Sequence, residues 1–292
     1  MTDLDRIRAI DTHVHIQVDD SGRYGASDEQ RQAMDRYFGS SEPARTVDET
    51  AAYYRERNMI AVVFTVDATT NTGHAPNSTD DIIAGAARNP DTLIAYGTVD
   101  PLGGAAALDE LHRQISLGVH GFKFHPTVQG FDPSDLQFDP LFTAIEQAGL
   151  PIVVHTGQTG VGAGVPGGLG LRLGLSNPML LDEVAARHPQ LQIVMAHPSV
   201  PWQDEAISIA THKANVWIDL SGWSPKYFSS ALVRATRTYL KHKMLFGSDF
   251  PALTPDRWLR DFTALELPDD VVQLVLKDNA VRLLGLDGTG AA

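Results

Sequence analysis

The stretch IRAIDTHVHIQ, residues 7–17, decides the fold because it places two histidines at the end of a short apolar run. Its β-branched residues predict a strand. Alternation along a strand sends residues i and i+2 to one face, so His13 and His15 are expected to project together, beside Asp11. The aliphatic residues are expected on the opposite face: Ile10, Val14 and Ile16. Two imidazoles on one face form half of a metal site, but the pair alone is weak evidence in a chain with 11 histidines.

The composition limits the classes of protein to which the chain can belong. Its 292 residues are 43% hydrophobic, which suffices for one large core. The 36 acidic residues exceed the 23 Lys and Arg, and no basic stripe occurs, so nucleic acid and membrane are not expected as partners. No apolar run reaches the roughly 18 residues that predict a membrane-spanning helix. The absence of cysteine excludes disulfides and thiolate ligands and fits a reducing cytosol, so we expect a cytoplasmic protein.

Eight short apolar or β-branched runs recur along the chain, separated by segments with helical periodicity. Buried runs that alternate with helices are typical of parallel strands covered by helices. Eight such units predict an α/β fold, a single-domain (β/α)8 TIM barrel over residues 1–292, with a doubly wound open sheet as the alternative. Extra C-terminal helices, within residues 268–286, are expected to pack outside the barrel. The runs lie at residues 6–16, 60–67, 93–101, 118–126, 150–157, 191–199, 215–222 and 243–251.

Two connections are longer than is usual in a compact domain, which is typical of lids and binding loops. Residues 17–45 contain Tyr24, Tyr37 and Phe38, and residues 157–176 are rich in glycine. Three glycines of the second loop have GxGxxG spacing. The next helix signal comes about ten residues too late for these glycines to open that helix, so we reject a dinucleotide site.

Side chains that can carry chemistry stand at the ends of five of the runs. They are His13 and His15 in the first, Lys123 and His125 in the fourth, His155 in the fifth, His197 in the sixth and Asp249 in the eighth. Active sites of such barrels lie at the carboxyl ends of the strands. Imidazole and carboxylate ligands suit zinc and similar ions, and an open coordination position would hold an acidified water. A satisfied core histidine is the alternative for any one residue, but a cluster of unpaired polar groups inside a barrel is costly. The set therefore predicts a metal centre.

With these motifs the chain resembles the amidohydrolase superfamily. DTHVHI, VVHTG, MAHPS and GSDFP, in this order and spacing, look most like the branch that includes aminocarboxymuconate-semialdehyde decarboxylase and γ-resorcylate decarboxylase. The C-terminal KDNAVRLLGL is similar to that branch as well, so the resemblance runs from Ile10 to Leu286. Hydrolases and decarboxylases share these motifs, so the resemblance does not name the substrate.

The resemblance implies a role for each matching residue. His13 and His15 match the ligand pair of the first strand, and His155 matches the ligand of the fifth. Asp249 matches the carboxylate that binds metal and relays a proton. His197 matches a proton-transfer residue beside a single metal, which in two-metal members is a ligand instead. We therefore expect about one Zn2+ or similar divalent ion per chain, with His197 and Asp249 as catalytic residues.

Three further residues are candidates for the site. Lys123 stands in GFKFHP, which is similar to the K-x-Y-P of dihydroorotases, where a carboxylated lysine bridges two metals. We favour the alternative, a buried ammonium paired with an inward carboxylate such as Asp11. His125 is predicted to contact substrate at the barrel mouth. Arg172, in the glycine-rich loop, is predicted to clamp a substrate carboxylate; the alternative is that it is solvated or pairs with a neighbouring chain.

These expectations define a metal-dependent hydrolase that acts on a small carboxylated or carbonyl compound through a metal-bound water. The first alternative is a zinc-dependent, non-oxidative decarboxylase of an aromatic or unsaturated acid. The second, from another class, is a barrel that binds a ligand without turnover, or a metal-free lactonase. A small molecule is the expected partner, and assembly into a homo-oligomer stays open.

Overall fold

The structure, a computed structural model, describes residues 4–39 and 42–287 and contains all eight predicted strands. Neighbouring strands pair in parallel, in the orders β1-β2-β3 and β4-β5-β6-β7-β8. Isolated parallel bridges, Val14 to Phe250 and Gly97 to Phe122, join the two sheets into a closed barrel. The strands are β1 Ala9–His15, β2 Met59–Phe64, β3 Leu93–Ala95, β4 Phe122–Phe124, β5 Ile152–His155, β6 Ile193–Ala196, β7 Val216–Asp219 and β8 Met244–Leu245. The predicted TIM barrel is confirmed.

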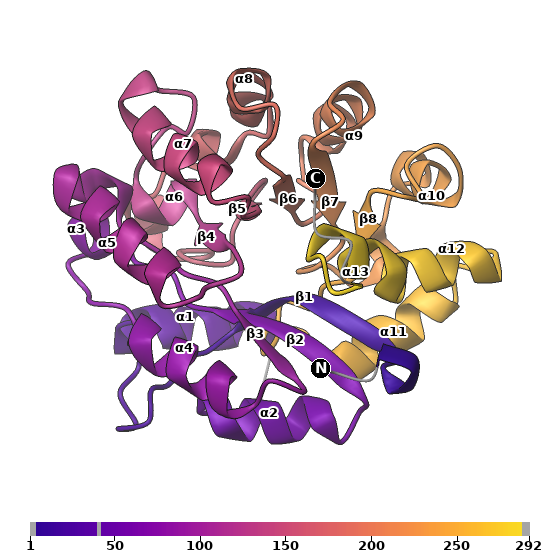
Figure 1. Ribbon diagram of the computed structural model, residues 1–292, viewed down its shortest axis with the longest axis horizontal. Helices are drawn as coiled ribbons and strands as arrows, with labels where there is room; N and C mark the ends of the chain where they lie inside the picture. Colours follow the sequence, from indigo (N-terminus) through magenta and orange to yellow (C-terminus); the bar gives the residue numbers. More distant parts are fainter. Residues whose placement is uncertain (1–3, 40–41, 288–292) are drawn as a thin grey trace.

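Most of the helices surround the barrel on its outer side (Figure 1). They are α1 Asp28–Phe38, α2 Val47–Arg55, α3 Thr69–Thr72, α4 Thr79–Arg88, α5 Ala105–Ser116, α6 Pro126–Gln129, α7 Asp139–Gln147, α8 Met179–Arg187, α9 Gln203–His212, α10 Ser230–Arg237, α11 Pro255–Thr263, α12 Asp269–Gln273 and α13 Asn279–Leu283. Local capping fixes where several begin; at α2 the Thr46 hydroxyl accepts from Glu49 N and Thr46 N donates to the Glu49 carboxylate. None of the described helices is long and apolar enough to cross a membrane.

Two apolar clusters divide the strand residues between the barrel interior and the layer under the helices. Ile10 belongs to the interior cluster and Val14 to the outer one. The pairing register of β1 shifts between Asp11 and Val14, as at a β-bulge. The prediction that Asp11 shares the face of His13 is therefore wrong, because Asp11 lies on the helix side, where the Tyr54 hydroxyl of α2 donates to it at 2.7 Å.

The C-terminal helices close the amino end of the barrel. Ala280 belongs to the interior cluster, and Val281 and Leu283 pack against it together with Leu4 and Ile7, which precede β1. This segment packs outside the barrel, as expected, and α13 covers the amino end, where the apolar interior needs a cover.

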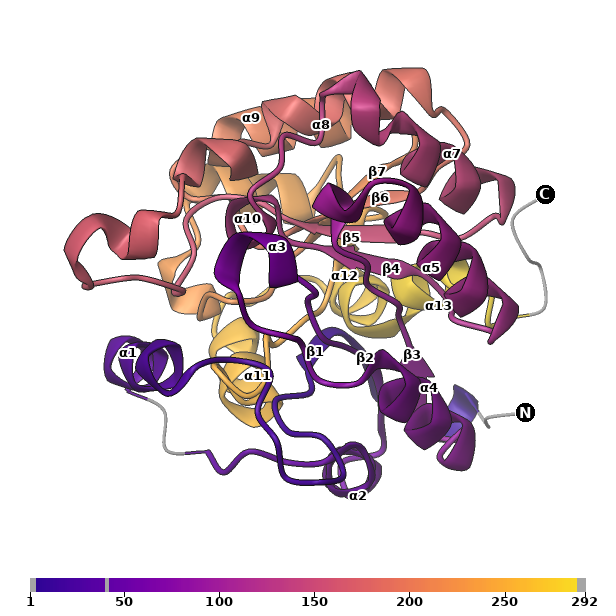
Figure 2. The same ribbon diagram turned by 90° about the vertical axis from the view of Figure 1, so that its left-hand side faces the viewer.

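The two long loops lie at the opposite end. Figure 2 shows α1 and the pink-red segment 157–176 projecting from the same side of the barrel, away from the first and last described residues. The first loop contains α1, which the sequence analysis did not predict. The second contains short 3-10 turns, and α8 begins only at Met179, as the rejection of a dinucleotide site requires.

Candidate metal centre and active site

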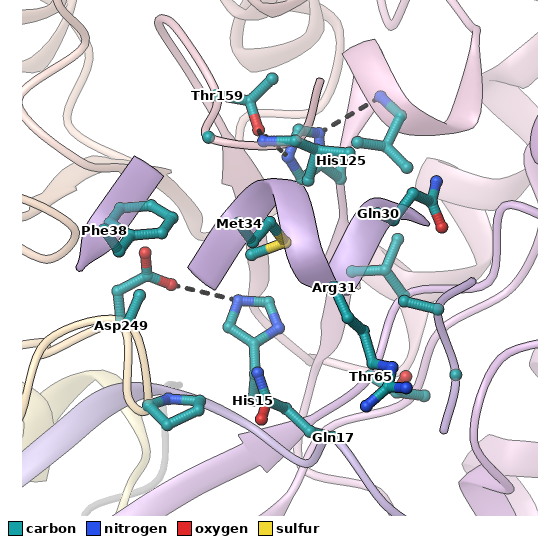
Figure 3. A pocket seen from close by; sticks show the side chains of 18 of the residues that line it. His15, Gln17, Gln30, Arg31, Met34, Phe38, Thr65, His125, Thr159 and Asp249 are labelled. Carbon is teal, nitrogen blue, oxygen red and sulfur yellow. Dashed lines mark hydrogen bonds and ion pairs between the residues drawn. The ribbon is translucent and has the colours of Figure 1, made fainter. Parts of the chain in front are cut away.

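Three of the predicted ligands converge at the carboxyl ends of β1 and β8. His13 Nε2 lies 3.5 Å from Asp249 Oδ1, and His15 Nε2 lies 3.2 Å from the same oxygen (Figure 3). One ligand atom from each of the three residues lies within 4.8 Å of the others. Backbone pairing fixes this arrangement, because Asp249 N donates to His13 O at 2.9 Å. Two imidazoles and a carboxylate brought together in this way are a donor set for a divalent ion.

His155 and His197 complete the cluster. His197 Nε2 lies 3.0 Å from His155 Nδ1, and the His197 ring centroid lies 4.8 Å from that of His13. His155 Nε2 is buried and has no hydrogen-bond partner among the described residues. His155 is not among the described residues whose ligand atoms lie within 4.8 Å of one another, so its role as a further ligand stays a prediction, which its unpartnered Nε2 supports.

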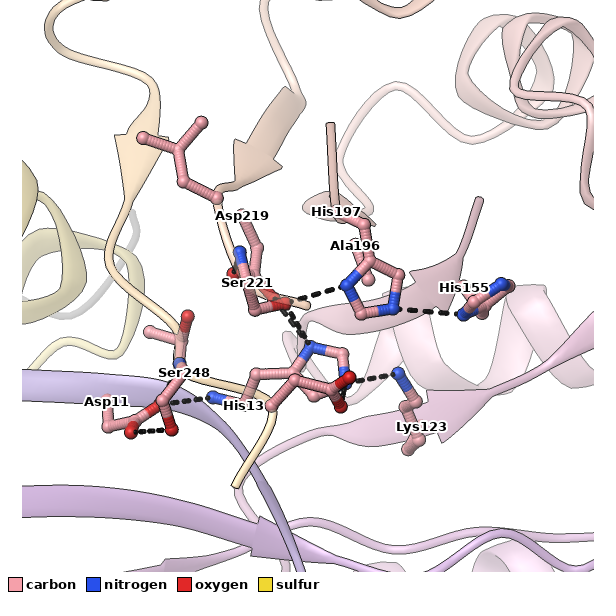
Figure 4. Close-up of polar contacts among 12 residues, drawn as sticks. Asp11, His13, Lys123, His155, Ala196, His197, Asp219, Ser221 and Ser248 are labelled. Atoms are coloured by element: carbon pink, nitrogen blue, oxygen red, sulfur yellow. Dashed lines mark hydrogen bonds and ion pairs between the residues drawn. The ribbon is translucent and has the colours of Figure 1, made fainter. Parts of the chain in front are cut away.

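Asp219, the last residue of β7, was missed by the sequence analysis. Its Oδ2 lies 2.6 Å from His13 Nδ1 (Figure 4), and both side chains are fully buried. Ser221 donates to Asp219 through its backbone N at 2.8 Å and its hydroxyl at 2.9 Å, and these bonds oppose the burial that raises the pKa of Asp219 to about 8. A divalent ion on His13 would favour the ionised carboxylate, with His13 Nδ1–H donating to Asp219 and the lone pair of Nε2 on the side of Asp249. The strand-end parity that selected His155 and His197 also applied to Asp219.

Lys123 is fully buried, and its Nζ lies 3.0 Å from His13 Nε2. Burial lowers the pKa of Lys123 to about 8, although the charges of Asp249 and Asp219 oppose this shift. The predicted pairing with Asp11 is wrong. Asp11 instead accepts hydrogen bonds from Ser248 on the helix side of β1. The carboxylates whose charges balance the Lys123 ammonium are those of Asp219 and Asp249.

Burial favours the neutral form of three imidazoles of the cluster. It lowers the pKa of His13 and His155 well below the ordinary value, and that of His197 to about 4. For Asp249 burial raises the pKa, but the hydrogen bond from His15 and nearby histidines more than compensate and lower it. Neutral imidazole and ionised carboxylate are the protonation states that bind metal. The donor set therefore fits a zinc-like ion.

The backbone is strained at two of these residues. His197 and Asp249 have φ of 75° and 66°, in the left-handed region that non-glycine residues rarely adopt. Gly222 lies against His197 so closely that a Cβ there would stand 2.5 Å from Nδ1. The strained residues are those expected to handle protons.

A cavity of about 310 Å3 opens above the cluster. His15, His155, His197 and Asp249 line it, so the reactive groups face its interior. The first long loop contributes much of the remaining wall, as Figure 3 shows for some of its side chains. Its contributions include Tyr24, Gln30, Arg31, Met34, Tyr37 and Phe38. The second loop contributes Gln158, Thr159, Gly160 and Val161.

The two predicted substrate contacts differ in position. His125 lines the cavity, with its ring stacked 3.7 Å from that of His155 and its Nε2 3.3 Å from Thr159 Oγ1. Arg172 is exposed and is not among the residues that line the cavity. Its role as a clamp stays a prediction that requires the second loop to close.

Solved structures share this fold over nearly the whole chain. An uncharacterised TIM-barrel protein from Bordetella bronchiseptica has a TM-score of 0.79 at 20% identity, covering 96% of this chain and 99% of its own. A probable 2-pyrone-4,6-dicarboxylic acid hydrolase from Acinetobacter baumannii, with citric acid bound, has a TM-score of 0.60 at 17% identity, covering 96% and 100%. A 2,6-dihydroxybenzoate decarboxylase from Rhizobium has a TM-score of 0.66 at 16% identity, covering 96% and 98%.

The sequence itself matches one protein family. No curated protein matches the chain. The family described as "Amidohydrolase" matches residues 10–286, which agrees with the extent of the resemblance and contains every residue of the cluster. The chain therefore belongs to the amidohydrolase family and is an enzyme of that family.

Proposed function

We propose that the chain is a metal-dependent hydrolase acting on a small carboxylated or carbonyl compound. The convergence of His13 Nε2, His15 Nε2 and Asp249 Oδ1 at the base of the cavity carries this proposal. These residues and His155 would hold about one zinc-like ion per chain. When bound, such an ion polarises a substrate oxygen or acidifies a water.

His197 would move the proton that the reaction requires. The Ser221 hydroxyl donates to Asp219 and lies 2.9 Å from His197 Nδ1, so Nδ1 carries a hydrogen and donates to Ser221. Nε2 of His197 then accepts from His155 Nδ1, which leaves the lone pair on the unpartnered Nε2 of His155. This order of donors gives His155 the tautomer of a ligand, and His197 would act as a base at Nε2 once its contact with His155 is given up. In hydrolysis His197 and Asp249 take a proton from the attacking water and return it to the leaving group.

Non-oxidative decarboxylation of an aromatic or unsaturated acid is the second candidate. The aromatic wall formed by Tyr24, Tyr37 and Phe38 favours it, since flat apolar rings pack well on such side chains. The fold shared with the 2,6-dihydroxybenzoate decarboxylase is consistent with it. In this reaction His197 would first take up a proton from water at Nε2 and then pass it to the carbon that loses CO2.

Lys123 bears on the number of metals. Its ammonium donates to the same His13 lone pair that an ion would take, so metal binding requires this contact to be given up. We propose one ion with Lys123 as a buried amine; a carboxylated Lys123 would support two. A metal-free enzyme, in which Lys123 supplies the positive charge beside His13, is the remaining alternative.

The reaction is tested by product analysis. The purified protein is incubated with lactones, amides and β-dicarbonyl compounds, and separately with aromatic hydroxy acids, while hydrolysis and CO2 release are measured independently. Hydrolysis without CO2 is expected. CO2 release would establish the decarboxylase instead, and failure to turn over either class with no retained metal would favour a ligand-binding barrel.

A further inference from the structure

His125 is held in one orientation by contacts at its backbone and its ring. Its backbone N donates to Gln129 Oε1 at 2.7 Å, and the buried Gln129 amide donates in turn to the carbonyls of Asp67 and Val99. The ring atom Nδ1 of His125 accepts from the backbone N of Val128 at 3.4 Å. Buried backbone N–H groups are nearly always paired, and a ring nitrogen that accepts carries no hydrogen. The hydrogen of the neutral His125 ring is therefore on Nε2.

The Thr159 hydroxyl accepts this hydrogen. Thr159 Oγ1 lies 3.3 Å from His125 Nε2 (Figure 3), and it also accepts from Val161 N at 3.1 Å. A hydroxyl group has two lone pairs and one hydrogen. Two N–H donors take up both lone pairs, so the group that Thr159 can still offer is its O–H hydrogen. No acceptor for this hydrogen lies among the described residues.

The segment that carries Thr159 is packed against α1 of the first long loop. Gln158 Nε2 donates to the Tyr37 hydroxyl at 3.4 Å. Gly160 lies so close to Phe38 that a Cβ at this glycine would stand 2.5 Å from the aromatic ring. These contacts on both sides of Thr159 position its hydroxyl before a ligand binds, which lowers the entropy that binding costs.

Thr159 and His125 both line the cavity above the reactive cluster. The His125 ring stacks on that of His155, with the ring centroids 3.7 Å apart and the ring planes 9° from parallel. His155 in turn lies 3.0 Å from His197 through its Nδ1. A small molecule that reacts at the cluster therefore comes within reach of the Thr159 hydroxyl.

We propose that the Thr159 hydroxyl donates a hydrogen bond to an oxygen of the substrate, and that His125 is a positioning residue that fixes Thr159 as a donor. This inference rests on the proposed function and deepens it. The substrate must present an oxygen that carries no hydrogen, such as a carbonyl oxygen, beside the reacting centre. Thr159 is then a specificity-determining residue, and His125 acts through it instead of contacting the substrate itself.

The hydrogen positions are tested first, on the protein as purified and without any ligand. Histidine is labelled with a nitrogen isotope, and long-range proton–nitrogen NMR spectra show which ring nitrogen of each histidine carries the hydrogen. The signals of His125 are identified by their loss in His125→Gln. His125 should have its hydrogen on Nε2, and this nitrogen should shift in Thr159→Val but not in Thr72→Val. A hydrogen on Nδ1 would overturn the proposal, because the Thr159 hydroxyl would then have to donate to His125.

Binding of two probes of equal shape tests the contact with a ligand. Acetophenone carries a carbonyl oxygen where α-methylstyrene carries a CH2 group, and dissociation constants for both are measured by NMR titration. The preference for acetophenone should fall about tenfold in Thr159→Val, the effect of one lost hydrogen bond, and should be kept in Thr159→Ser. Thr72→Val is the matched control, because Thr72 also lines the cavity but its hydroxyl already donates to Ala68 O at 2.8 Å.

The proposal is overturned if Thr159→Val and Thr72→Val change the preference equally, or if acetophenone does not bind the wild type. Thermal unfolding midpoints near that of the wild type confirm that the variants are folded. Neither measurement requires turnover. Failure of the proposed function is read separately, from metal content and product analysis.

Discussion

Asp219 Oδ2 lies 2.6 Å from Nδ1 of His13, on the opposite side of the imidazole ring from the Nε2 that faces Asp249. A carboxylate in this position fixes the ring and raises the basicity of the far nitrogen. The hydrogen bonds that Ser221 donates hold Asp219 in turn. The geometry of the metal centre thus depends on a residue that would not touch the ion.

Asp219→Asn should weaken metal binding by about 10- to 100-fold, the usual effect of losing such a partner. Metal affinity is measured by competition with a chelator. Asp182→Asn is the matched control, because Asp182 pairs with Lys213 between helices and should leave the affinity unchanged. Equal affinities for wild type and Asp219→Asn would show that this contact is merely structural.

His197→Ala should retain the metal and lose activity on the order of 100-fold or more, as expected for a positioned acid–base group. His13→Ala and Asp249→Ala should lose both. Metal content and kcat are measured on the same preparations. Loss of metal from His197→Ala would mean that His197 is a ligand.

Gly222→Ala should lower kcat, because the new Cβ would stand 2.5 Å from His197 Nδ1 and displace the ring. Gly164→Ala separates this contact from backbone strain, since Gly164 has a similar φ of +74° with nothing within 4 Å. Both variants should lose stability in thermal unfolding, but only Gly222→Ala should lose activity beyond its loss of folded protein. Equal kinetic effects would remove the steric argument.

Asp11 should make the stability depend on pH. Burial raises the pKa of this carboxyl from 3.8 to about 6 in the folded state. Between these values the folded state holds a proton that the unfolded state has lost, so the contribution of Asp11 to the free energy of unfolding falls as pH rises, by about 3 kcal/mol in all. Urea unfolding from pH 4 to 7 should show this fall for the wild type relative to Asp11→Asn. Parallel curves for the two proteins would contradict it.

The strands and most of the metal centre could be predicted because their signals are local. Buried β-branched runs mark strands, and a polar residue at the end of such a run marks the active-site face. Asp11 was misplaced because a bulge in β1 reverses its side, and the bulge depends on pairing with β2. Asp219 meets the same strand-end rule, but its role as the partner of His13, 206 positions away in the chain, depends on the fold that brings the two together.

The conformations of the two long loops were harder to predict, because they also depend on contacts between distant parts of the chain. The capping residues Ser27 and Gln30 are typical of a helix start, but the short and polar sequence of α1 shows little helical periodicity of apolar residues. The path of each loop decides which arginine reaches the cavity. In the structure Arg31 lines the cavity and Arg172 is exposed.

The measurement that tests the central claim most directly is the metal content of the active enzyme. Elemental analysis is done on protein purified without added metal or chelator, and activity is followed through chelation and restoration. We predict about one zinc-like ion per chain, lost together with activity and restored with it. Two ions would assign a carboxylated Lys123 to the site. A fully active enzyme without metal would contradict the account and leave Lys123 as the charge beside His13.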